Sequence, residues 1–88
     1  MRKLSNARRC QPMSEKELYL YYDVIDRLIA YIRHHSEYVC KNQSTFADEL
    51  NKAGVQIFFM KDYPSAKACF WVARMLGNKH ASRNWICI

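Results

Sequence analysis

The feature that most constrains this chain is an apolar stretch, residues 46–77, in which small side chains recur at helical spacing. Its first half places small or apolar residues at successive spacings of three, one and three, at Leu50, Ala53, Gly54 and Ile57. Its second half continues the pattern, at Ala66, Phe70 and Ala73. Small residues at Gly54 and Ala66 allow two antiparallel helices to approach closely, with Ile57 and Phe70 filling the groove between them. The stretch therefore predicts a tight helical hairpin.

Capping and turn signals mark the ends of the two hairpin helices. Thr45 and Asp48 have the spacing of a capping box, so we expect the first helix to begin there. In the turn, Asp62 can cap the second helix, with Pro64 in its first turn. Gly77 can end that helix in the left-handed conformation. Residues 78–88 are then predicted to form a short final helix that folds back on the hairpin.

A longer helix is predicted before the hairpin. Ser14 and Glu17 form a capping box, so this helix should begin at Glu15. An apolar seam with a seven-residue repeat follows, at Leu18, Tyr21, Ile25, Leu28, Ile32, His35 and Val39. The seam predicts one helix of about 20 to 25 residues. His34 and His35 would lie near its end, where an imidazolium suits the helix dipole.

The apolar surface of this first helix is wider than one seam. Five more residues broaden it, at Leu20, Tyr22, Val24, Ile29 and Tyr31. A helix apolar over so much of its circumference must contact more than one neighbour. We therefore predict a homodimer whose contact includes Leu18, Tyr21, Ile25, Leu28 and Ile32. The alternative is a four-helix monomer that uses both sides of the helix internally.

Composition agrees with an all-α fold. The 88 residues include only two glycines and two prolines, so the chain has few turn residues and favours helices over short strands. We expect one helical domain over residues 14–88. Residues 1–13 form a basic arm that lacks apolar periodicity, and we predict that it is flexible. Because Met13 offers a second start, the arm could equally be an upstream extension.

The hairpin resembles one tetratricopeptide unit, a helical pair of about 34 residues. The matching positions are Ala47, Leu50, Ala53, Gly54, Ile57, Asp62, Tyr63, Ala66, Phe70 and Ala73. The sequence contains one copy, whereas an array stacks at least three. Some other part of the protein, or a partner, must therefore cover the second face of the hairpin.

A second resemblance covers residues 61–87. Its residues are Asp62, Tyr63, Ala66, an aromatic at Phe70 or Trp71, Ala73, and the run Arg83, Asn84, Trp85 near a cysteine. In this order they are similar to the AraC negative regulator family of small bacterial proteins. The resemblance implies a short helical protein without catalytic residues, which binds a transcription activator of the AraC type and damps it. It also implies a bacterial or phage source.

Trp71 is the residue that most suggests a binding surface. Lys67 lies four residues before it and Arg74 three residues after it, so the three side chains share one side of a helix. Tryptophan and arginine are enriched at binding hot spots. We predict partner binding through Lys67, Trp71, Arg74, Arg83 and Trp85. The alternative is that Trp71 packs under the final helix against Trp85.

The sequence offers no basis for catalysis. Cys10, Cys40, Cys69 and Cys87 are scattered, with neither the close pairs of a zinc site nor a histidine and acid arranged for nucleophilic chemistry. Two glycines cannot build a phosphate-binding loop. We therefore expect no enzyme activity, metal, cofactor or small-molecule substrate. Without a signal-peptide core or an apolar stretch of about 18 residues, we predict a cytoplasmic protein with free thiols.

Charge supports a rival function. The net charge is +6, and the excess of lysine and arginine lies at the two ends of the chain. This balance suits nucleic acid as well as an acidic protein surface. In the rival hypothesis the phosphate contacts come from Arg8, Arg9, Lys79 and Arg83. A third option is a peptide bound on the concave side of the hairpin.

Overall fold

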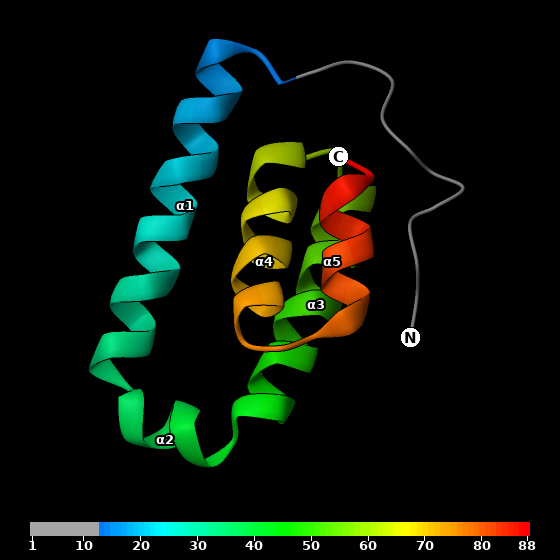
Figure 1. The fold of residues 1–88 in the computed structure, drawn as a ribbon. Coiled ribbons are helices and arrows are strands. Elements are labelled where there is room, and N and C mark those ends of the chain that lie inside the picture. The colour runs from blue at the N-terminus through cyan, green and yellow to red at the C-terminus, as the bar shows by residue number, and fades with distance from the viewer. Residues whose placement is uncertain (1–12) are drawn as a thin grey trace.

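The computed structural model describes residues 13–88, and all the regular secondary structure in that range is helical (Figure 1). The helices are α1 (Glu15–His34), α2 (Ser36–Lys41), α3 (Gln43–Phe59), α4 (Tyr63–Met75) and α5 (Lys79–Ile86). The fold is therefore all-α, with a long first helix, a helical pair and a short last helix, as predicted. The basic arm, with Arg8 and Arg9, lies outside the described residues.

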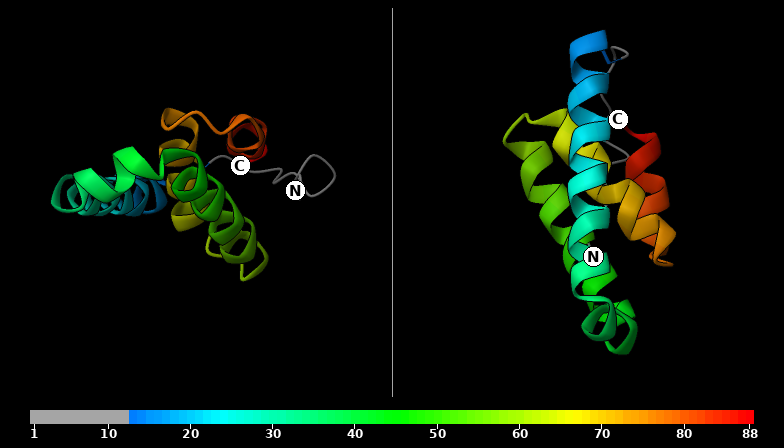
Figure 2. Two further views of the ribbon diagram at one scale, coloured as in Figure 1. Left: turned by 90° about the horizontal axis from the view of Figure 1, so that it is seen from below. Right: turned by 90° about the vertical axis from the view of Figure 1, so that its left-hand side faces the viewer.

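Helix α4 is the centre of the fold. It packs against α3, α1 and α5, whereas α1 makes no backbone approach to either α3 or α5. Seen from below, α1 lies to one side of the molecule, and α3 and α5 lie on the other (Figure 2). The contacts of α1 with α3 and α5 are therefore made by side chains. The arrangement leaves space beside α4, between α1 and α5.

The helical pair α3 and α4 closes through its small residues. The two helices run antiparallel (Figure 1), and the fully buried ring of Phe70 lies directly against Gly54. A Cβ atom at Gly54 would lie 2.5 Å from the Cε1 atom of that ring. Gly54 is therefore required by this close approach, which confirms the predicted hairpin contact. The likeness of the pair to a tetratricopeptide unit stays a prediction.

The caps predicted for α1 and α4 are present. Ser14 and Glu17 form the capping box of α1. At α4, the Asp62 carboxylate accepts a hydrogen bond from the Ser65 N–H at 3.4 Å. The same helix ends before Gly77, which has a φ of 100°. The chain then turns back, because Asn78 caps α5 by accepting from the Ala81 N–H at 3.0 Å.

Helix α1 begins at Glu15 and has 20 residues, as predicted, but the predicted apolar seam extends past its end, so the expectation that the whole seam lies in one helix is corrected. The helix ends at His34, because His35 has a φ of −121° and a ψ of 32°, and α2 then continues the chain in a new direction. Val39 remains buried in α2. The apolar repeat thus continues through a bend that hydrophobic spacing alone does not reveal.

The start of α3 was also predicted wrongly. The helix begins at Gln43 rather than at the Thr45 capping box, and Asn42, its first flanking residue, forms no side-chain cap. Instead, the Gln43 Nε2 atom donates a hydrogen bond to the Leu76 carbonyl at 3.0 Å. A contact between the start of α3 and the end of α4 therefore accompanies the earlier start.

A buried polar pair joins α3 to α5. The Asn84 Nδ2 atom donates to the Asn51 Oδ1 atom at 3.0 Å, and both side chains are fully buried. A buried amide is costly unless it is hydrogen-bonded, so the two residues require each other. The pair fixes how α5 lies on the hairpin, and the sequence analysis missed it.

A membrane-spanning segment would have to be both long and apolar. Within residues 13–88, no helix meets both requirements.

Candidate functional site

Four of the predicted binding residues come together on one face of α4 and α5. The rings of Trp71 and Trp85 lie 5.5 Å apart between centroids, at an angle of 44°. The Lys67 Nζ atom lies 4.6 Å from the centroid of Trp85. The Arg74 guanidinium carbon lies 5.1 Å from the centroid of Trp71 and 5.4 Å from that of Trp85. The cluster thus contains two tryptophans with a cation over each ring.

The fold explains why these side chains meet. Lys67, Trp71 and Arg74 are three or four residues apart in α4, so they project from one side of that helix. The turn at Gly77 and Asn78 reverses the chain and brings Trp85 of α5 back along the same side. The predicted neighbourhood of Lys67, Trp71 and Arg74 is therefore confirmed, and Trp85 joins it.

Tyr21 links the cluster to α1. The Trp85 Nε1 atom donates a hydrogen bond to the Tyr21 hydroxyl oxygen at 3.1 Å. Burial raises the pKa of the Tyr21 phenol above its ordinary value, although the hydrogen bond from Trp85 acts in the opposite direction. The phenol is therefore neutral at physiological pH. This contact bridges α1 and α5 across α4.

A groove opens beside the cluster, with α4 as its floor and α1 and α5 as its walls. Its volume is about 380 Å³. It is lined by Met13, Leu18, Tyr21, Tyr22, Ile25, Lys67, Trp71 and Trp85, and we call it the tryptophan groove. All of these side chains except Lys67 are apolar or aromatic. Such a surface suits an apolar ligand group, with positive charge at its edge.

Part of this groove was not predicted from the sequence. Met13 was expected to belong to the arm, yet it packs against the buried cluster of Tyr21, Ile25 and Ala68. Tyr22 was expected only as part of a wide apolar surface. The adjacent pair Tyr21 and Tyr22 was the sequence signal for this surface. Neighbouring helix residues point in different directions, so one tyrosine can be buried while the other faces the space beside α4.

Trp71 has features of both predicted environments, packing under the final helix and exposure at a binding surface. It is half-buried, contacts Trp85 and packs against the cluster around Tyr21 and Ile25. It also lines the tryptophan groove. Arg83 is exposed on α5 but is not a lining residue of that groove.

The residues predicted for dimer contact have different environments. Tyr21 and Ile25 are buried within the chain, in a cluster with Ala68 of α4. Leu18 is 39% exposed, and Leu28 and Ile32 are half-buried. The homodimer stays a prediction, but Tyr21 and Ile25 are already covered by the same chain. The mass of the protein in solution tests it.

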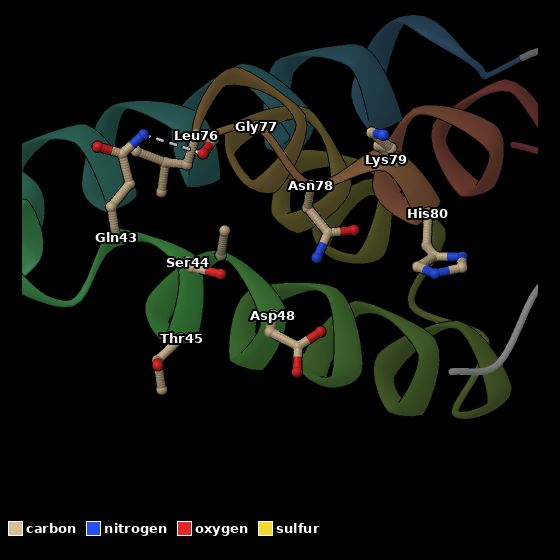
Figure 3. A pocket seen from close by; sticks show the side chains of 10 residues that line it. Gln43, Ser44, Thr45, Asp48, Leu76, Gly77, Asn78, Lys79 and His80 are labelled. Atoms are coloured by element: carbon tan, nitrogen blue, oxygen red, sulfur yellow. Dashed lines mark hydrogen bonds between the residues drawn. The ribbon is translucent and has the colours of Figure 1, made fainter.

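A larger and more polar hollow lies where the ends of three helices meet (Figure 3). Its volume is about 610 Å³. Asp48 of α3 and His80 of α5 enter it from opposite sides, and Gln43 is hydrogen-bonded to the Leu76 carbonyl at its rim. Its polar side chains are exposed or half-buried, and Asp48 pairs with Lys52 at 3.6 Å. Lys79, a predicted phosphate contact, also lines it.

The thiols of the described chain do not form a reactive centre. Cys40 is exposed, whereas Cys69 and Cys87 are buried, and all three are free. Burial raises the pKa of the Cys69 thiol to about 11, so this group stays protonated near neutral pH. No group of three histidine, cysteine, aspartate or glutamate side chains within residues 13–88 is placed to hold a metal ion.

Comparison of the chain with known proteins gives no relative from which a function could be transferred. No family model, curated protein or solved structure matches it.

Proposed function

We propose that the protein is a small non-catalytic regulator that binds another protein through the face around the tryptophan groove and thereby changes gene expression. The resemblance of residues 61–87 names the partner class, a transcription activator of the AraC type. One observation carries the proposal: Trp71 and Trp85 stand side by side at an open apolar groove, with Lys67 and Arg74 over their rings.

Residues of this kind account for much of the affinity of protein interfaces. Tryptophan and arginine are enriched at hot spots, where truncation costs about 2 kcal/mol or more. In the proposed complex, Trp71 and Trp85 supply apolar contact area. Lys67 and Arg74 supply charge at the edge of the groove, and Arg83 contributes at the outer rim. The cytoplasm is the proposed compartment, because transcription activators act there.

Co-purification of the full chain with an AraC-type activator tests the proposal. Trp71→Ala should weaken binding about 30-fold, the equivalent of about 2 kcal/mol. Phe59→Ala is the matched control, because Phe59 is an aromatic residue that is 47% exposed, is the last residue of α3 and does not line the groove. Equal retention of the activator by wild type and Trp71→Ala, with both proteins folded by circular dichroism, would remove this surface from the proposal.

Direct nucleic-acid binding is the rival function, and the same purified protein can be used to distinguish the two functions. It predicts a gel shift that weakens steeply with salt and is lost in a Lys79→Glu, Arg83→Glu double variant. Both residues are exposed on α5. A sequence-selective gel shift that persists at moderate salt, without any activator bound, would favour the rival over the regulator.

A further inference from the structure

We infer that the segment of the partner that enters the tryptophan groove is an amphipathic α-helix carrying carboxylates beside its apolar face. This inference rests on the proposed function and specifies the chemistry of the partner. Two independent properties of the groove support it: its shape, which is set by three helices, and the charge at its edge.

The shape of the groove favours a helix. Helices α1 and α5 flank α4 without a close backbone approach, and they contact each other across it through the hydrogen bond between Trp85 and Tyr21. The groove beside this bridge is lined mostly by side chains of the three helices. An amphipathic helix binds in an apolar groove of this kind through residues spaced i, i+3, i+4 and i+7. An extended peptide that binds by strand addition would need a strand edge to pair with, and residues 13–88 contain no strand. The apolar lining of the groove suits the apolar face of such a helix.

The charge of the groove favours an acidic ligand. The cation-binding faces of the two tryptophans already carry Lys67 and Arg74 of the same chain, so a cationic side chain would be repelled. Arg74 is exposed and forms no ion pair with a carboxylate of the described residues. Residues 61–88 contain five basic side chains and one acidic side chain, Asp62. A carboxylate beside Arg74 therefore meets a positive field, and within residues 61–88 only Asp62 could compete with it for Arg74.

The same geometry disfavours a single strand of nucleic acid in this groove. Binding of unpaired bases relies on open aromatic faces on which the bases stack. Here the two tryptophan rings face each other at an angle and carry cations over their faces. Within residues 13–88, the groove has a single charged lining residue, Lys67, which is too few to follow a phosphate backbone.

The chain carries its own reporter for the test. Its two tryptophans are Trp71 and Trp85, and both line the groove, so intrinsic fluorescence reports on occupancy directly. The probe is a tryptophan-free peptide of about 16 residues, with leucines at i, i+3, i+4 and i+7 and glutamates beside them. One comparison peptide has the same composition in scrambled order. A second has lysine in place of each glutamate.

The acidic amphipathic peptide should change the fluorescence saturably, and the other two should bind about tenfold more weakly or not at all. Arg74→Glu should weaken the acidic peptide about fivefold and strengthen the basic one. Lys79→Glu is the matched control, because it makes the same charge change at the first residue of α5, where a carboxylate suits the helix dipole. Arg74→Gln replaces Arg74→Glu if the latter unfolds, and should give a smaller loss.

Several outcomes would overturn the inference. One is equal binding of the acidic and basic peptides, and another is equal binding of the ordered and scrambled peptides. A third is displacement of the peptide by an oligo-dT strand at lower concentration, which would assign the groove to nucleic acid. Peptide binding without capture of an activator would reject only the proposed function. Capture of an activator that does not depend on Arg74, with no peptide binding, would reject only this inference.

Discussion

The two sides of α4 differ in how completely they are closed. On the side of α3, Phe70 is fully buried against Gly54, and no room remains for one added methyl group. On the side of α1 and α5, the neighbouring residue Trp71 is half-buried at an open groove. One helix thus carries a closed internal contact and an open aromatic surface at consecutive positions.

The difference follows from the partners that α4 meets on each side. Small residues allow α3 to approach until the space between the helices is filled. Helices α1 and α5 meet α4 separately and contact each other only through side chains, such as the hydrogen bond between Trp85 and Tyr21. Stability should therefore depend most on the closed side, and binding on the open side.

The largest effect should come from Phe70→Ala. Because the ring is fully buried, we expect a loss of about 3–5 kcal/mol in the free energy of unfolding. Trp71→Ala should cost less, about 1–2 kcal/mol, because that ring is half-buried. Urea denaturation of both variants measures the difference. Equal losses would mean that the two sides of α4 are equally closed.

Removal of one member of the buried amide pair should rank second. Asn51→Ala leaves the amide of Asn84 without the hydrogen bond that it donates to Asn51, at a cost of about 1–3 kcal/mol. Denaturation of the two single variants and of the Asn51→Ala, Asn84→Ala double variant tests the coupling. The double variant should lose less than the sum of the single losses. Additive losses would show that the two amides do not depend on each other.

Alkaline pH should weaken the fold through the buried thiol of Cys69. The folded-state pKa of this thiol is raised from 9.0 to about 11, so its contribution is complete below pH 9 and is lost as the pH rises through 11. The loss at pH 11 should be about 2 kcal/mol. Cys69→Ala should lose less stability than wild type over this interval. The same slope in both proteins would place the pH sensitivity elsewhere.

A methyl group at Gly54 should have a smaller net effect. Gly54→Ala forces the Phe70 ring to move, which costs about 1–3 kcal/mol. Alanine also favours the helix by about 1 kcal/mol, so we expect a net loss of about 1 kcal/mol. Gly77→Ala is a useful comparison, because nothing lies within 4 Å there and its effect comes from a φ of 100°. Stabilisation by Gly54→Ala would show that the contact is looser than described.

The smallest effect on stability should come from Arg74→Ala. Arg74 is exposed and its contacts are with ring faces, so the free energy of unfolding should fall by less than about 1 kcal/mol. Binding of the acidic peptide should still weaken, by less than the loss of about fivefold expected for Arg74→Glu. Thermal denaturation and peptide titration of one sample separate the two effects. A large loss of stability would make Arg74 a structural residue.

The hairpin and the caps of α4 could be predicted because their causes are local in the sequence. Asp62 and Gly77 act at the ends of α4, and Gly54 meets Phe70 between two helices that are neighbours in the chain, so residue type and spacing were sufficient. The convergence of Lys67, Trp71 and Arg74 followed from helical spacing in the same way. For this reason the all-α class and the floor of the groove could be predicted from the sequence.

Features that depend on contacts between residues far apart in the sequence could not be predicted. The bend at His35 lies within a regular apolar repeat, and the start of α3 involves the hydrogen bond from Gln43 to Leu76. The pairing of Asn51 with Asn84 joins residues 33 positions apart. The register of Asn51 between Ala47 and Val55 placed it on a buried face, but no pattern identified the amide that it meets.

The central position of α4 also sets the order in which the protein can assemble as it is made. Translation produces α1 first, yet the surface that covers Tyr21 and Ile25 includes Ala68. The ribosome must therefore release most of α4 before the first helix has its internal neighbour. During that interval an aromatic helix is open to any binder in the cell, so newly made chains should depend more on chaperones than the finished fold does.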